Sequence, residues 1–118
     1  MFAKVRGAVE ALKATARALD PACIDGHDAA ALFEAVSEGE RACGAMKALL
    51  ARRIEETKVW REGGYRSAAH WVAEATGETV GVACRTLETA RALDALPETD
   101  AAFRAGKLSP TQAAEMIA

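Results

Sequence analysis

The chain has 118 residues, a formal net charge of −2, few aromatic residues and only three prolines, and it is rich in alanine. This length suits one domain with a single core, and glycine and proline fall between periodic segments, which excludes a disordered chain. The negative charge disfavours a strong nucleic-acid binder, because Lys and Arg supply most of such affinity.

The first predicted element is an amphipathic helix over residues 1–20. Apolar residues alternate there at spacings of three and four, which is the period of one helical stripe: Phe2, Val5, Val9, Leu12, Ala16 and Leu19. Charged residues interrupt the segment, so it lacks the continuous apolar run of a signal peptide or a membrane span. We therefore expect no contact with a membrane.

A long helix is predicted over residues 25–60, because Asp25 can cap its start and the next helix breakers are Gly63 and Gly64. Its predicted core-facing stripe is Leu32, Val36, Gly39, Cys43, Met46 and Leu50. The three cysteines, Cys23, Cys43 and Cys84, are odd in number and far apart. We interpret them as small core residues with reduced thiols, which indicates a cytoplasmic protein.

Residues 67–94 predict a pair of helices with the lengths of a helix-turn-helix. Ser67 and Thr79 can cap the two helices, and Gly77 suits the turn between them. The apolar positions Ala83, Leu87, Ala90 and Leu93 predict the buried face of the second helix. In a helix-turn-helix, the exposed residues early in that helix, Gly81, Arg85 and Glu88, would face a major groove of DNA.

Short helices are predicted over residues 97–118, where Ser109 and Gln112 form a capping signal around Pro110. The last of them stops within an apolar stretch, so we expect the chain to be a fragment of a longer protein. The sequence as a whole predicts one all-α helical domain over 1–118, with one long helix, a helix-turn-helix-like pair and short C-terminal helices.

Few residues suit catalysis. The chain contains no asparagine, and its two histidines, His27 and His70, lack partners at a recognised metal-ligand spacing. It has no Cys-x-x-Cys pair, phosphate-binding glycine loop or nucleophile elbow, and its adjacent carboxylates are typical of a solvated helix surface. We predict no catalytic residue, metal ligand or cofactor in this chain.

Residues 41–70 are the candidate DNA-binding segment, because they hold seven Lys or Arg against three Glu. Arg85 could pair with a guanine edge and Arg66 with a phosphate. Further backbone contacts would come from the basic segment, so the candidate nucleic-acid-binding residues are Arg52, Arg53, Arg61, Arg66 and Arg85.

The alternative is a structural or protein-interaction domain with no DNA contact. In that case the long helix would pack against a second copy, or against a C-terminal region, through the small residues Gly39, Ala42 and Cys43. Under either function, Trp60, Tyr65 and Trp71 form a core cluster or a base-stacking platform, and we favour the core cluster.

Three motifs in order resemble a known family over about residues 20–118. They are Trp60 to Gly77 (WREGGYRSAAHWVAEATG), Leu87 to Ala90 (LETA) with Leu96 and Pro97, and Gly106 to Ala114 (GKLSPTQAA). They resemble the domain of unknown function 222, a helical family that typically precedes a C-terminal HNH endonuclease domain in bacterial proteins. The resemblance implies a non-catalytic, nucleic-acid-associated module, and any divalent metal would belong to the missing nuclease domain.

Overall fold

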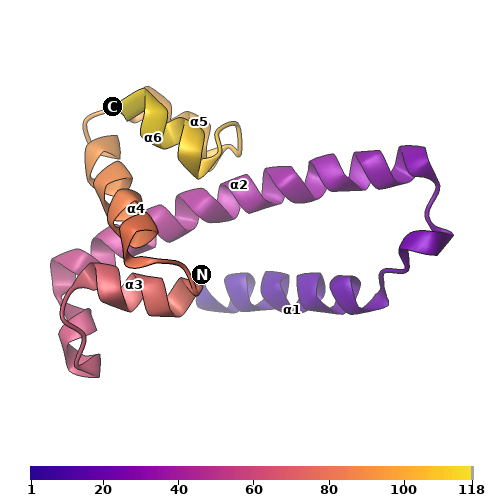
Figure 1. Ribbon diagram of the computed structural model, residues 1–118. Coiled ribbons are helices and arrows are strands. Elements are labelled where there is room, and N and C mark those ends of the chain that lie inside the picture. Colours follow the sequence, from indigo (N-terminus) through magenta and orange to yellow (C-terminus); the bar gives the residue numbers. More distant parts are fainter. Residues whose placement is uncertain (118) are drawn as a thin grey trace. The chain divides into compact units, whose positions relative to one another are not determined.

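The computed structural model describes residues 1–117, in which helices dominate and no strand forms (Figure 1). The elements, in chain order, are α1 (Phe2–Ala18), the 3-10 turn η1 (Pro21–Cys23), α2 (Gly26–Thr57), η2 (Val59–Gly63), α3 (Ala68–Thr76), α4 (Val80–Leu93), α5 (Pro97–Arg104) and α6 (Pro110–Ile117). The predicted all-α class is confirmed, with one long helix and short C-terminal helices. The chain divides into two compact units, Met1–Glu34 and the part from Ala35 onward.

The long helix α2 ends three residues earlier than the predicted boundary at residue 60. Lys58 adopts left-handed backbone angles, with φ 60° and ψ 23°. A residue in this region cannot continue a right-handed helix, so the chain leaves α2 there and enters η2. The break comes at a lysine rather than at the glycine pair that the sequence suggested.

The buried side chains of the second unit form two clusters. The Val72 cluster joins α2, α3 and α4, and it consists of Ala51, Ala68, Ala69, Val72, Ala73, Ala83 and Leu87, with Trp60 and Trp71 packed against it. The Phe103 cluster joins α2, α4, α5 and α6, and it consists of Ala45, Ala48, Ala90, Leu93, Phe103 and Ala113, with Leu108 and Ile117 at its side. Trp60 and Trp71 therefore contribute to the core, as the sequence suggested, whereas Tyr65, the third predicted member, belongs to neither cluster.

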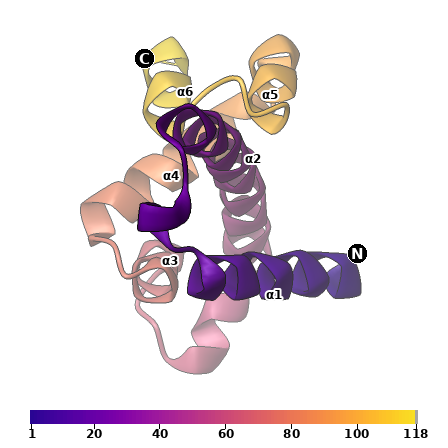
Figure 2. The ribbon, with the colours of Figure 1, turned by 90° about the vertical axis from the view of Figure 1, so that its right-hand side faces the viewer.

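The connections between these helices position α4 against its neighbours. Packing is most extensive between α3 and α4, and α4 also contacts α5 and α6. In Figure 2, α5 and α6 lie as a pair joined by the loop that contains Gly106. The predicted capping signal is confirmed at the start of α6, since the Gln112 amide donates to Ser109 Oγ and the Ser109 amide donates to Gln112 Oε1.

The predicted core-facing stripe of α2 is wrong. Leu32, Val36, Met46 and Leu50 are 46 % exposed or more, whereas Ala45, Ala48 and Ala51 are the buried residues of this helix. Small side chains let α4 and the neighbouring helices approach closely, whereas Leu32, Val36 and Met46 remain exposed. The prediction that the cysteines are core residues is also wrong, because Cys23, Cys43 and Cys84 are all exposed.

An ion pair also links α2 to α4. Arg91 donates from Nε to Glu55 Oε1 over 2.8 Å and from Nη2 to Oε2 over 2.7 Å. These two hydrogen bonds lower the pKa of Glu55 below its usual value and raise the pKa of Arg91. The planar guanidinium matches the carboxylate at both oxygens, so this contact fixes the register of the two helices.

The first unit, Met1–Glu34, is organised differently from the second. Its helix α1 buries no residue, and the only half-buried side chains in the unit are Val9 and Ile24. Asp20 accepts a hydrogen bond from the Ala22 amide at η1, and Asp25 accepts one from the His27 amide at the start of α2. None of the described helices is both long and apolar enough to span a membrane.

Candidate nucleic-acid interface

The helix-turn-helix-like pair forms at the predicted residues. Ser67 Oγ accepts a hydrogen bond from the His70 amide at the start of α3, and Thr79 Oγ1 accepts one from the Val82 amide at the start of α4. Between them, Gly77 has φ 75°, a left-handed conformation that ends α3. The three residues proposed to face a major groove, Gly81, Arg85 and Glu88, are exposed.

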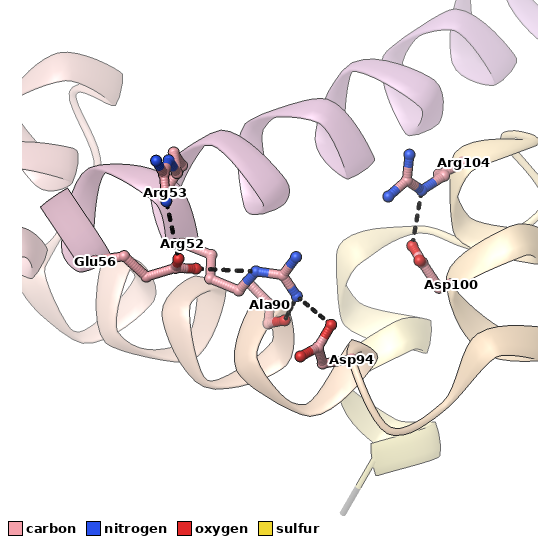
Figure 3. Close-up of polar contacts among 7 residues, drawn as sticks. All are labelled: Arg52, Arg53, Glu56, Ala90, Asp94, Asp100 and Arg104. Atoms are coloured by element: carbon pink, nitrogen blue, oxygen red, sulfur yellow. Dashed lines mark hydrogen bonds and ion pairs between the residues drawn. The ribbon is translucent and has the colours of Figure 1, made fainter.

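Two of the five candidate arginines bind carboxylates of this same chain (Figure 3). Arg52 Nη1 donates to the Ala90 carbonyl over 3.2 Å and lies 3.4 Å from Asp94 Oδ1, so this side chain connects α2 to the end of α4. Arg53 Nη1 lies 3.3 Å from Glu56 Oε2. These carboxylates partly neutralise the positive charge of Arg52 and Arg53 that would otherwise attract a phosphate. In addition, only 26 % of the Arg52 side chain is exposed.

The other three candidates, Arg61, Arg66 and Arg85, form no ion pair among residues 1–117. The guanidinium of Arg61 lies over the Trp60 ring, 5.2 Å from its centroid. Lys58 is likewise exposed and outside any ion pair in the described chain. We call Lys58, Arg61 and Arg66 the basic corner, since all three lie in the connection between α2 and α3.

Two aromatic residues, Trp60 and Tyr65, lie between the cations of the basic corner and anchor this connection. Trp60 packs against the Val72 cluster, and a hydrogen bond to the Glu74 carboxylate raises the pKa of the Tyr65 phenol above its usual value. Both aromatic residues are only partly exposed. The cations of the corner thus project from a connection that is anchored at two points, whereas Arg85 lies apart from them on α4.

A groove in the second unit was not predicted from the sequence. It has a volume of about 930 Å³ and lies between α2, α3, α4 and α6, and it is mainly apolar. Its lining includes Gly44, Ala48, Leu50, Ala51, Ile54, Val72, Ala75, Val82, Phe103 and Ala114, with the charged residues Lys47, Glu78, Arg85 and Glu115. The sequence holds one signal for this groove, the alanines spaced by three at 45, 48 and 51. The signal is weak, because alanine fits equally well on any face of a helix.

The histidines and carboxylates do not gather in the described part of the chain. His70 Nδ1 lies 2.7 Å from Ser67 Oγ, and His27 Nδ1 lies 3.8 Å from Asp25 Oδ1. Between Met1 and Ile117, no three His, Cys, Asp or Glu side chains are placed to hold a metal ion.

Comparison with known proteins gives one family and no characterised relative. No curated protein and no solved structure matches this chain. The model of the family described as Domain of unknown function (DUF222) matches residues 30–118, which include the second unit and part of the first. The chain therefore belongs to the DUF222 family.

Proposed function

We propose that this chain is the non-catalytic helical module of a bacterial HNH endonuclease-like protein, and that it binds nucleic acid in the cytoplasm. The observation that carries this proposal is the basic corner, where three exposed cations lie within nine residues and form no ion pair in the described chain. Phosphate binding needs cations of this kind, because a paired arginine must first give up its carboxylate. The divalent metal of an HNH site would be held by the nuclease domain.

The exposed start of α4 supports the same function. Arg85 is exposed beside the α3–α4 turn and could reach a base edge, while the basic corner would contact the backbone. Arg52 and Arg53 have a smaller role in this proposal than their position in the basic segment suggested, because Glu56 and Asp94 already neutralise them.

The test is fluorescence anisotropy of labelled double- and single-stranded DNA, titrated with the chain at about 50 and 200 mM salt. The double variant Arg61→Ala, Arg66→Ala is expected to bind more weakly and to lower the salt slope of log K by about two, since each phosphate contact contributes about one. The matched control is Arg104→Ala, Lys107→Ala, which removes the same charge from two exposed cations outside the connection between α2 and α3. Equal losses in both double variants, or no binding at the lower salt concentration, would contradict the proposal.

A second candidate function is protein binding, which the apolar groove favours. An amphipathic helix of a partner protein would place small and aliphatic residues against Ala48, Ala51 and Ala75, and the charged rim would fix its direction. Helix-in-groove recognition of this type depends mainly on apolar surface and should depend less on salt than phosphate binding does.

The groove can be tested with an environment-sensitive dye such as anilinonaphthalene sulfonate. Its fluorescence is expected to rise with the native chain and to fall markedly with Ala75→Glu, which places a charge that repels the dye's sulfonate in the groove at an exposed helical position. Ala101→Glu is the control, because Ala101 is also exposed and helical but lies outside the groove. The same fluorescence from both variants would locate dye binding elsewhere and remove this second candidate.

A further inference from the structure

The apolar stripe of the helix α1 is exposed at most of its positions. Its exposed fractions are 80 % at Phe2, 45 % at Val5 and 61 % at Leu12, and Leu19 just beyond its end is 51 % exposed. An isolated helix of this length is only marginally stable in water, and most helices in proteins gain their stability by packing an amphipathic face. A 17-residue helix that buries none of its residues therefore needs a surface to cover it.

The first turns of α2 have the same property. Leu32 is 48 % exposed and Phe33 is 74 % exposed, and Val36, one turn further along the same helix, is 64 % exposed. Large apolar side chains at spacings of three and four on an exposed helix are typical of a helix–helix interface. The chain thus presents two helical segments whose large apolar side chains are mostly exposed.

The charges of these two segments are complementary. α1 carries Lys4, Arg6, Lys13 and Arg17 against one carboxylate, Glu10, whereas residues 20–40 carry six carboxylates and no Lys or Arg. Two copies related by a two-fold axis would bring α1 of each against α2 of the other, so the favourable pairing would occur twice. Pairing α1 with a second α1 would instead oppose like charges.

We propose that this chain forms a homodimer through α1 and the N-terminal turns of α2, with α1 of one copy packed on α2 of the second. The interface is a four-helix arrangement whose centre is Leu12, Phe33 and their apolar neighbours, and whose edges are basic on α1 and acidic on α2. It uses none of the residues of the basic corner or the groove, so its failure would leave the proposed function intact.

The first experiment measures the mass of the full chain in solution by light scattering and sedimentation across the micromolar range. The native chain is expected at twice its mass of 12.4 kDa. Leu12→Glu is expected to weaken association about tenfold or more, because it places a charge at the interface centre. Ala14→Glu is the control, since it adds the same charge about 200° around the helix from Leu12.

A native chain that stays monomeric throughout this range overturns the proposal. A monomeric native chain in which Leu12→Glu alone lowers the helical circular dichroism also overturns it, because the stripe would then be covered within one chain. Equal dimerisation of Leu12→Glu and the native chain would do the same.

The second experiment tests which helices meet. One variant reverses charge on α1, Arg6→Glu with Arg17→Glu, and the other reverses charge on α2, Asp28→Lys with Glu40→Lys. The two positions lie about 16 Å apart along α1 and about 18 Å apart along α2, so they can meet in antiparallel pairing.

Each variant alone is expected to associate several-fold more weakly at low salt, and an equimolar mixture is expected to recover the native affinity. Recovery arises because both α1–α2 contacts of the mixed dimer again join opposite charges. A mixture that associates no better than its components overturns the pairing of α1 with α2 of the second copy.

Discussion

Replacing Phe103 with alanine is expected to lower the free energy of unfolding of the second unit by about 3–5 kcal/mol. Phe103 is 1 % exposed and is the largest of the fully buried side chains, in a cluster whose other members are mostly alanine. Alanine neighbours cannot extend into the space that the ring leaves, so much of the cavity would remain. The loss should therefore fall in the upper part of the range for large-to-small substitutions.

Urea unfolding followed by tryptophan fluorescence measures this loss, because Trp60 and Trp71 both lie in the second unit. The tryptophans pack against the Val72 cluster, so a shifted transition would also show that the two clusters unfold together. Phe103→Leu is the graded control, which keeps part of the buried volume and should lose clearly less. A loss below about 1 kcal/mol for Phe103→Ala would mean that the ring does not hold the Phe103 cluster together.

Gly106→Ala is expected to destabilise the chain by about 2–4 kcal/mol, for two reasons that add. Gly106 has φ 76°, where an alanine is strained, and a β-carbon there would lie 3.0 Å from the Glu38 carbonyl oxygen. The Glu38 carbonyl belongs to the backbone of α2, so it can make room for the β-carbon only if α2 shifts away from the α5–α6 loop. Such a shift would also disturb the hydrogen bond that Arg41 Nε donates to the Gly106 carbonyl.

Gly77→Ala is the matched control for this prediction. Gly77 has nearly the same φ, 75°, but a β-carbon there would meet nothing within 4 Å. Gly77→Ala should lower the free energy of unfolding by only about 1–2 kcal/mol, which is the cost of holding an alanine in the left-handed conformation. The difference between the two variants in urea unfolding measures the close approach at Glu38, and equal losses would show that α2 and the loop accommodate a methyl group freely.

Sequence reasoning succeeded where large and small residues alternate clearly. In α4, Leu87 and Leu93 mark one face unambiguously, and both are buried as predicted. The caps at Ser67 and Thr79 were also predictable, because capping needs only a side chain and an amide a few residues away. Local signals of this kind do not depend on the rest of the fold.

The same reasoning failed for α2 because it weighs residues by size. Met46 and Leu50 outweighed Ala45 and Ala48 in the pattern, although close helix packing selects the smaller side chains for the buried face. The candidate site was only partly predictable for a related reason. The basic segment is visible in the sequence, but Asp94, which pairs with Arg52, lies 42 positions away, and only the fold brings it there.

Alanine is the most frequent residue of both buried clusters. We therefore expect this family to tolerate fewer substitutions at these buried positions than a leucine-rich core would. A leucine core can change to isoleucine or methionine and still fill its space, because the exchange conserves volume. A buried alanine between close helices has no such neutral neighbours: glycine loosens the helix and every larger residue forces the backbones apart. The buried alanines from Ala45 to Ala113 should therefore vary less among DUF222 chains than the larger apolar residues that α1 and α2 expose.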